Sequence, residues 1–407
     1  MVSRKMIASA LTLSVLVGAA FVFNLPAAIS YEASDRTAAS VEPGIVEANN
    51  EFGLEMVREL SDDEGNVFIS PVSISSSLLM AYNGASGETK ETMARTLEIE
   101  NMSREEVNSQ YSKLLGSLTG VDRKVTLEVA NSVWIHDDFE GHVNEEYRAD
   151  VTRNFDAGIF VKPFNQETAN QMNSWVKQNT NGKIKELVDS FQPRERMFLV
   201  NAIYFKGDWS NKFDESNTDE EKFDSPSGKQ KVQMMEQRED FRYYSDTEFK
   251  MVRLPYGREK VAMYVFLPQN DSLEEWLAST SMDEINDGIK SSTEREVQVK
   301  LPKFEMKYSQ GLKEELRALG MGNAFSNTAN FERMADKPLK ISRVKHKTYV
   351  KVDEEGTEAA AITGTGMMMI TSAPPRNLRF IADRPFFFII RDDRTGAMLF
   401  AGKIVSP

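Results

Sequence analysis

Residues 352–375 read V-D-E-E-G-T-E-A-A-A-I-T-G-T-G-M-M-M-I-T-S-A-P-P, a run of small residues that leads into an apolar cluster and ends at a double proline. Successive side chains of a strand point to opposite faces of a sheet. In an extended conformation, one face would carry small, hydroxylated or apolar side chains: Thr357, Ala359, Ala361, Thr363, Thr365 and Met367. The other face would carry Glu358, Ala360, Ile362, Gly364 and Gly366. The first face is suited to burial, and the second, which holds the one charge, would lie nearer solvent.

The same segment also admits a helical interpretation. Thr357 precedes Glu-Ala-Ala-Ala, and a threonine in that position can cap the first turn of a short helix. Gly364 and Gly366 weaken any strand that contains them. A segment that can be loop, strand or helix is a candidate conformational switch, and its neighbours in the sequence have to decide between these states.

The composition is that of an ordinary soluble globular protein. The chain has 407 residues, of which 41% are hydrophobic and 27% charged, so it is long enough to bury a sizeable core. Its formal net charge is −13 at pH 7. Non-specific nucleic-acid binding needs a basic face, so we expect no nucleic-acid partner.

Few side chains are available for catalysis or metal binding. The chain has no cysteine, which excludes disulfides, thiol nucleophiles and thiolate metal sites. It has three histidines, at positions 136, 142 and 346. No nucleophile elbow, zinc-protease motif, Walker loop or dinucleotide fingerprint occurs, and the pair Gly364 and Gly366 lacks the third glycine of a phosphate loop. A dispersed Ser-His-Asp triad stays open, but we expect no catalytic residue, no metal and no cofactor.

The N-terminus has the pattern of a targeting segment. Arg4 and Lys5 precede an uncharged run over residues 6–23, and Ala28-Ile-Ser30 has the spacing of a cleavage site. We predict that residues 1–30 are a cleaved signal peptide, with a membrane anchor as the alternative because 18 residues can span a bilayer. Residues 31–44 are predicted to be a disordered spacer. The body of the protein is then secreted, or anchored outside the cytoplasm, and the absence of cysteine indicates a microbial source.

Hydrophobic periodicity places helices mainly in the first half and strands mainly in the second. Helices are predicted over residues 45–60, 73–83, 88–97, 103–118, 139–155, 167–180 and 312–319. Strands are predicted over residues 66–70, 125–135, 158–164, 197–205, 230–237, 249–255, 261–267, 296–301, 341–344, 348–352, 386–391 and 398–405. This order, without regular alternation, predicts an α+β fold.

Seven blocks of the chain, in family order, resemble the serpin family of protease inhibitors. They read N-V-F-I-S-P-V-S at 66–73, G-A-S-G-E-T at 84–89, L-V-N-A-I-Y-F-K-G-D-W at 199–209, L-P-K-F at 301–304, L-G-M at 319–321 with A-F at 324–325, E-E-G-T-E-A-A at 354–360 and F-I-A-D-R-P-F at 380–386. The resemblance covers residues 45–407. It implies one large domain with a central, mostly antiparallel sheet A, further sheets B and C, about nine helices and an exposed reactive-centre loop.

The resemblance also implies a mechanism. A serpin is a suicide substrate: a protease cleaves the exposed loop, which then enters sheet A as a new strand and traps the acylated enzyme irreversibly. The chain would therefore be an inhibitor of serine-type endopeptidases, with cysteine-type enzymes as a further class, and not an enzyme. Insertion competes with deacylation, so small uncharged residues at the start of the loop favour fast entry.

The functional positions carry over by motif. The hinge of the loop would be Gly356, Thr357, Glu358, Ala359, Ala360 and Ala361. The shutter, a polar cluster beneath sheet A, would be Ser70, Ser73, Asn201 and His346. The breach, where insertion begins, would hold Trp209, Glu354 and Lys303.

The resemblance also implies a reactive bond: the family's spacing counted from Gly356 gives Ile370–Thr371, whereas counting back from Pro374, as in some family members, gives Thr371–Ser372. We choose Ile370–Thr371 because insertion constrains the hinge-side length. An aliphatic residue after three methionines favours an elastase-like, subtilisin-like or chymotrypsin-like target for a monomeric inhibitor. A non-inhibitory carrier or chaperone is the main alternative, and a serine hydrolase is a third.

Overall fold

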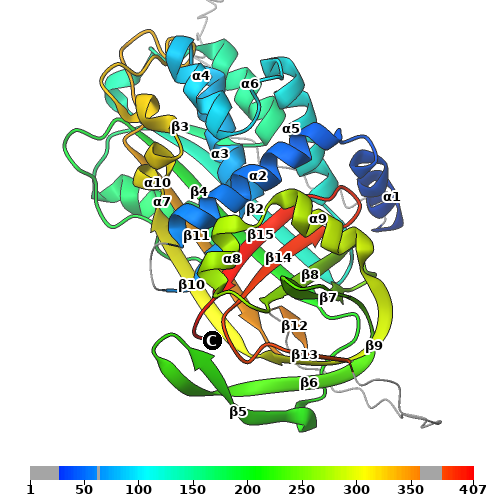
Figure 1. Ribbon diagram of the computed structural model, residues 1–407. Coiled ribbons are helices and arrows are strands. Elements are labelled where there is room, and N and C mark those ends of the chain that lie inside the picture. Colours follow the sequence, from blue (N-terminus) through cyan, green and yellow to red (C-terminus); the bar gives the residue numbers. More distant parts are fainter. Residues whose placement is uncertain (1–26, 62–64, 358–377) are drawn as a thin grey trace, which may run out of the picture.

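The computed structural model describes residues 27–61, 65–357 and 378–407 (Figure 1). Residues 1–26 and 358–377 lie outside this part. The predicted hinge residues Glu358, Ala359, Ala360 and Ala361 and the predicted reactive bond between Ile370 and Thr371 therefore lie outside the described residues.

A six-stranded sheet, called the central sheet below, runs through the molecule in the order β10-β11-β12-β4-β2-β3. Its strands are β2 Val125–His136, β3 Gly158–Lys162, β4 Met197–Asp208, β10 Phe304–Gly311, β11 Arg343–Val352 and β12 Gly356–Thr357. Two pairs are parallel, β11 with β4 and β2 with β3, and the other pairs are antiparallel.

The second sheet has nine strands in the order β1-β15-β14-β8-β7-β6-β9-β13, with β5 paired to β6. The strands are β1 Val67–Ile69, β5 Thr218–Ser225, β6 Gly228–Ser245, β7 Phe249–Tyr256, β8 Val261–Pro268, β9 Thr293–Pro302, β13 Leu378–Ile381, β14 Phe386–Asp392 and β15 Met398–Ile404. The 18-residue strand β6 connects its two halves, because one end of β6 pairs with β7 and the rest with β5 and β9.

Ten α-helices lie in the described residues. They are α1 Ala27–Ala38, α2 Pro43–Leu60, α3 Pro71–Gly84, α4 Gly87–Thr96, α5 Arg104–Leu118, α6 Glu145–Phe155, α7 Gln166–Asn179, α8 Leu273–Ser279, α9 Met282–Ser291 and α10 Lys313–Ala318. Every residue of α3 is buried. Its start is fixed by Pro71 at the first helical position and by Ser70, whose hydroxyl accepts a hydrogen bond from the Ser73 amide.

The hydrophobic core lies on both faces of the central sheet. Alternate residues of β4, such as Leu199, Ile203 and Phe205, pack into the main cluster with α2, α3 and the second sheet. The intervening residues Phe198 and Val200 pack into a smaller cluster beneath α7. The nearly continuous apolar run at 197–205 is thus a strand buried on both faces, as predicted.

The predicted α+β fold is confirmed, and the differences are local. The two short strands expected at 341–344 and 348–352 form the single strand β11. The helix expected from residue 139 begins only at Glu145, where Asn144 caps it. Helices α8 and α9 were not predicted, although each begins with a capping box, S-L-E-E at Ser272 and S-M-D-E at Ser281.

The prediction of a disordered spacer over residues 31–44 differs from the structure, because α1 extends through Ala38 and α2 begins at Pro43. The segment is poor in apolar residues, and polar contacts anchor it instead. The Ser34 hydroxyl donates to the Ser117 carbonyl at 2.6 Å, and Asp35 pairs with Lys260 and Arg394 at 2.6 and 3.1 Å.

The targeting function of residues 1–30 stays a prediction. Among the described helices, none is both long enough and apolar enough to cross a membrane. The apolar run at 6–23 lies outside them.

Candidate functional site

The predicted hinge enters the central sheet at one end, between two strands that are otherwise paired with each other. Over residues 343–349, β11 pairs directly with residues 198–204 of β4 in parallel. Beyond that stretch, Thr357 of β12 lies between Val352 of β11 and Gly207 of β4. Strand β12 is antiparallel to both neighbours, which is the direction that a further strand between them would take. It lies at the end of the sheet remote from α4 and α10 (Figure 1).

Gly356 occupies a position that no other residue fits. Its φ is +152°, a conformation that side-chain-bearing residues rarely adopt. A Cβ atom there would lie 2.1 Å from the Gly207 carbonyl oxygen and 2.7 Å from the Asp208 Cα. The close approach of the β4 backbone therefore requires glycine at the turn that leads from β11 into β12.

Thr357 is the first side chain of the predicted hinge to enter the sheet. It is fully buried, and its hydroxyl lies 2.7 Å from the hydroxyl of Tyr256 on β7. Because it opposes Gly207, it faces the main core, on the same side as Phe205. This matches the face assigned to Thr357 from the alternation of the loop sequence.

Trp209 holds the turn that precedes the hinge. Its ring is 1% exposed and stacks on Tyr256 with ring centroids 4.4 Å apart. The indole nitrogen donates to the Asp353 carbonyl at 2.9 Å, and the Trp209 amide donates to the Glu355 carbonyl at 3.0 Å. Trp209, which directly follows β4, therefore holds the backbone between β11 and β12 by two hydrogen bonds.

Glu354 and Lys303, predicted to form an ion pair, do so at 2.7 Å. The Glu354 carboxylate also accepts a hydrogen bond from the Thr218 hydroxyl at 2.8 Å. Burial by itself would raise the pKa of the Glu354 carboxyl, but the hydrogen bonds from Lys303 and Thr218 outweigh it and hold that pKa below its usual value. A second pair, Lys212 with Glu355, fixes the same turn.

The four predicted shutter residues meet in one fully buried network. The Asn201 amide donates to the Ser73 carbonyl and hydroxyl and, at 2.6 Å, to the Asn131 side-chain oxygen. The imidazole Nδ1 of His346 contacts the Asn201 oxygen, and its Nε2 accepts from the Ser70 amide at 3.2 Å. The network joins β2, β4, β11 and α3, so it lies where β4 and β11 would have to separate.

The chemistry of this network requires a neutral histidine. Nε2 accepts a hydrogen bond from a backbone amide, so the proton of the neutral ring is on Nδ1, which faces the Asn201 oxygen. Burial lowers the pKa of His346 to about 3. The contact is also a register pair of the two strands, because His346 opposes Asn201. Its function in strand separation stays a prediction.

Sequence reasoning missed several residues that complete these two sites. Asn131 interrupts the otherwise apolar face of the strand predicted at 125–135, and that interruption is its signal, since a buried amide needs partners. Thr348, whose hydroxyl donates to the Phe68 carbonyl at 2.6 Å, gave a similar signal. Tyr256, Thr218 and Lys212 gave none, because their partners lie more than 100 residues away in the chain.

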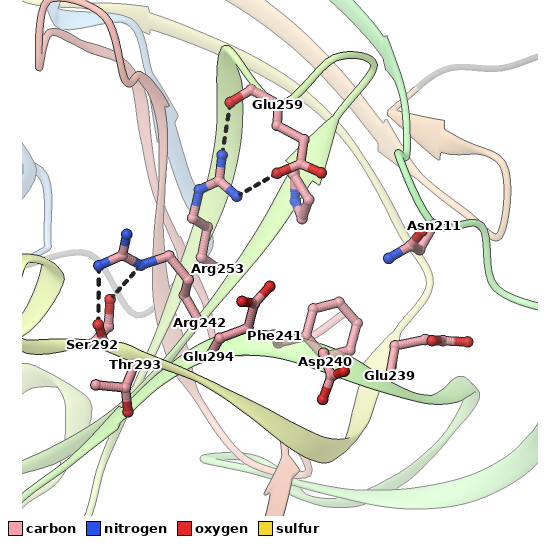
Figure 2. Close-up of a pocket in the computed structure, with 11 residues that line it drawn as sticks. Asn211, Glu239, Asp240, Phe241, Arg242, Arg253, Glu259, Ser292, Thr293 and Glu294 are labelled. Atoms are coloured by element: carbon pink, nitrogen blue, oxygen red, sulfur yellow. Dashed lines mark hydrogen bonds and ion pairs between the residues drawn. The ribbon is translucent and has the colours of Figure 1, made fainter.

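A cavity of about 600 Å³ lies beside the breach, between β6, β7 and the start of β9 (Figure 2). Its two arginines are already engaged: Arg242 donates to Ser292, and Arg253 pairs with Asp393 and Glu259. No histidine lines it.

The three histidines, all in the described part of the chain, form no catalytic triad there. His346 contacts an amide oxygen and a backbone amide, and His142 contacts Asp336 at 2.7 Å. His136 lies with Asp137 and Asp138, whose possible ligand atoms are within 4.8 Å of one another. Arg196 already pairs with Asp138 at 2.9 Å, which offsets part of the negative charge of that cluster.

Comparison with known proteins gives a consistent result. The family model described as "Serpin (serine protease inhibitor)" matches residues 47–407. An uncharacterized serpin-like protein of Thermococcus kodakarensis is 34% identical over 376 residues, which cover 90% of this chain and 86% of that protein.

Solved structures agree. The native state of the thermophilic serpin Tengpin superposes with a TM-score of 0.84 at 29% identity, over 90% of this chain and 95% of that one. Human thyroxine-binding globulin in complex with thyroxine gives a TM-score of 0.81 at 26% identity, over 90% and 99%.

Proposed function

Because this chain belongs to the serpin family, the serine protease inhibitors, we propose that it is a secreted inhibitor of serine endopeptidases that inserts its own cleaved loop into the central sheet. The observation that carries the proposal is the position of β12. Gly356 and Thr357 already form the first two residues of a strand between β4 and β11. Insertion would lengthen an existing strand, and no new one would have to be nucleated.

The pairing of β12 predicts the register of the whole inserted strand. Each residue after Thr357 would oppose one residue earlier on both β4 and β11. Thr363 would then lie between Asn201 and His346, and Gly366 between Phe198 and Arg343. Both of these pairs already face each other across β4 and β11, so a single strand fits the gap without a register shift.

The free energy of insertion would come from backbone pairing and burial. The seven direct register pairs between β4 and β11 would be replaced by pairing of the new strand on both sides. The face that turns toward the core would carry Ala359, Ala361, Thr363 and Thr365 behind Thr357. These small side chains fit beneath the sheet, so they would slow the insertion of the strand little.

An intact loop is tethered, which explains why cleavage would trigger insertion. Strand β13 holds Leu378 against Val297 of β9, and β13 and β12 lie at the same end of the molecule (Figure 1). Insertion to residue 366 spans about 30 Å, and the eleven residues 367–377 reach at most about 40 Å. The uncut loop would have to return in a largely extended conformation, whereas a cut at Ile370–Thr371 would remove this constraint.

The target class follows from the loop sequence. Ile370 after three methionines suits an elastase-like, subtilisin-like or chymotrypsin-like enzyme, and the lack of a basic residue there disfavours a trypsin-like one. The assignment of Ile370–Thr371 as the reactive bond is tested by mass spectrometry of the fragment that the protease releases. A cut outside residues 369–372 would refute it.

The central test mixes the protein with subtilisin or elastase and resolves the products on a denaturing gel. A covalent band at the summed mass, together with a cleaved inhibitor of raised melting temperature, is expected. Cleavage that gives neither result would overturn the proposal. It would instead favour a non-inhibitory carrier, a possibility raised by the similarity to thyroxine-binding globulin.

A further inference from the structure

We propose that a cavity at the end of the central sheet opposite β12 binds an oxyanion of the phosphate or sulfate type, and that the bound anion ties β4 to β11. The regulatory half of this inference rests on the proposed function, because it concerns the two strands that insertion would separate. The binding half rests on the charge and geometry of the cavity alone.

The cavity has a volume of about 160 Å³ and is built from three segments. Arg194 and Arg196 come from the residues that lead into β4, and Lys340 comes from those that lead into β11. The third segment, at residues 326–329, follows the short helix after α10 and contributes Ser326 and Asn327. Tetrahedral oxyanions are small enough for this space.

The lining has an excess of positive charge. Three cationic side chains line the cavity, and no carboxylate is among its described lining residues. Such a site is unexpected in a chain with a net charge of −13. The positive charge at this cavity is therefore local and does not reflect a generally basic surface, so the cavity would attract anions.

The hydrogen bonds of the three cations leave most of this charge uncompensated. Within the part of the chain that the structure describes, Arg194 makes no ion pair or side-chain hydrogen bond. Lys340 donates to the neutral Asn327 oxygen at 2.6 Å. Arg196 pairs with Asp138 through Nε and donates to the Pro193 and Glu195 carbonyls through one terminal nitrogen. An oxyanion could accept from the donors that remain, with the fork geometry that arginine favours.

Backbone hydrogen bonds hold the two cationic segments at a fixed separation. The Arg196 amide donates to the Ser342 hydroxyl at 2.8 Å, and the Ser342 amide donates to the Met197 carbonyl at 2.9 Å. Met197 and Ile341 are fully buried. The backbone at the ends of the two strands is therefore held at a fixed separation before an anion binds, which lowers the cost of ordering the site.

The location gives the anion a mechanical effect. The direct pairing of β4 with β11 begins at Phe198 and Arg343, two residues after Arg196 and three after Lys340. Insertion to Gly366 would have to part the strands at that point. An anion held between Arg194 or Arg196 on one side and Lys340 on the other would resist this separation. It would stabilise the uninserted state and divert cleaved inhibitor from trapping to simple hydrolysis.

The binding test compares melting temperatures in sodium phosphate and in sodium chloride of the same ionic strength. Phosphate is expected to raise the melting temperature of the wild type by several degrees over chloride. The variants Arg194→Gln and Lys340→Gln should lose this difference. Lys290→Gln, which removes an exposed charge on α9, is the matched control and should keep it. Equal phosphate effects in all four proteins, or none in the wild type, would overturn the site.

Two sources of the anion are separated by a second arm with a sulfated oligosaccharide. If the oligosaccharide saturates the rise in melting temperature at a concentration of anionic groups far below that needed with phosphate, the ligand is a polyanionic chain. If both probes need the same concentration of anionic groups, the ligand is a free small anion. Loss of the shift in Lys340→Gln is expected with either probe.

The regulatory half is read from the ratio of cleaved to complexed inhibitor with subtilisin. Phosphate should raise that ratio severalfold in the wild type but not in Lys340→Gln, and an unchanged wild-type ratio would refute the tie between the strands. If no complex forms under any condition, the proposed function fails, while the melting experiment still decides the site.

Discussion

The hydroxyl of Thr357 lies 2.7 Å from the hydroxyl of Tyr256, and both residues are fully buried beneath the central sheet. Thr357 belongs to the predicted hinge and Tyr256 to β7 of the second sheet, so the contact fixes β12 to the second sheet. Tyr256 also stacks on Trp209, which holds the backbone of the turn. These contacts fix β12, and with it the start of the predicted hinge, between β11 and β4.

Replacement of Thr357 by arginine should convert the inhibitor into a substrate. The side chain would have to enter the core face beside Tyr256, where a guanidinium finds no carboxylate among the described contacts and a buried unpaired charge is very costly. We expect the covalent band with subtilisin to disappear while cleavage continues. Thr357→Val is the matched control: it keeps the shape and should keep the band, although the lost hydrogen bond lowers stability by about 1–3 kcal/mol. An undiminished complex with Thr357→Arg would contradict the hinge function.

The register of insertion makes a second prediction, which concerns two threonines two residues apart. Thr363 would arrive between Asn201 and His346, where its hydroxyl can replace the contact that those residues lose. Thr365 would arrive between Leu199 and Val344, which are apolar. Thr363→Val should therefore reduce the gain in melting temperature that follows loop cleavage, and Thr365→Val should leave it unchanged or larger.

The measurement is differential scanning calorimetry of the cleaved proteins, with the intact proteins as reference. Equal effects of Thr363→Val and Thr365→Val would show that the strand does not enter in the register of β12. A reversed order of the two effects would indicate a slip of two residues.

Much of the fold could be predicted because its signals are local. The apolar run at 197–205 and the alternation at 125–135 identified the two longest strands of the central sheet. The order of the motifs identified Gly356 as a candidate hinge residue. The structure gives a physical reason for glycine at this position, since a Cβ there would overlap the Gly207 carbonyl. The family model over residues 47–407 confirms serpin membership, and the observed elements confirm the α+β class.

The remaining features depend on contacts that leave no local pattern. The prediction that residues 31–44 are disordered rested on low apolar content, and α1 is held instead by Asp35 with Lys260 and Arg394. Tyr256 lies 101 residues before Thr357, so no local sequence pattern near either residue predicts their contact. The cationic cavity combines three segments whose charges are unremarkable one at a time.

The ion pair of Glu354 with Lys303 should stabilise the breach by about 1–2 kcal/mol, a range reduced because Lys303 is partly exposed. Glu354→Gln removes the charge and keeps the shape, so it should lower the free energy of unfolding, measured by urea denaturation, by that amount. The exposed pair of Lys307 with Glu305 offers a control, and Glu305→Gln should change stability by less than about 0.5 kcal/mol. Equal costs for the two variants would contradict a special function of the breach pair.

The same pair predicts a pH dependence. The pKa of Glu354 is lower in the folded state than in the unfolded state, so its stabilisation is present above the unfolded pKa, near 4.5. The stabilisation is lost as the pH falls through the folded pKa. Glu354→Gln should therefore flatten the acid limb of the stability profile and leave the neutral region parallel to that of the wild type.

Arg394 should matter more than its partner Asp35 for the anchoring of α1. Arg394 pairs with the fully buried Asp392 at 2.8 Å as well as with Asp35 at 3.1 Å. Arg394→Gln would leave Asp392 as a buried charge without its partner, which costs about 3–5 kcal/mol. Asp35→Asn removes only a half-exposed carboxylate and should cost about 1 kcal/mol or less. Urea unfolding of the two variants tests this order, and equal costs would contradict it.

His346 should give the protein a stability that declines below neutral pH. Burial holds its folded pKa at about 3, against 6.5 for an unperturbed histidine. The unfolded chain therefore binds a proton near pH 6.5 that the folded shutter does not bind. The stabilisation is complete above pH 6.5 and decreases as the pH falls. It stops decreasing once the pH reaches the pKa of His346 in the folded state, about 3.

Between pH 6.5 and pH 5 this one group should remove about 2 kcal/mol, since each pH unit in that window is worth about 1.4 kcal/mol. Urea unfolding at pH 7 and pH 5 measures the difference. His346→Gln, which cannot titrate, should lower stability at pH 7 because it disturbs the contacts with Asn201 and Ser70. It should also lose most of the change between the two pH values, whereas a variant of the half-exposed His142 should retain it. A wild-type change that persists in His346→Gln would mean that the buried imidazole is not the group that titrates.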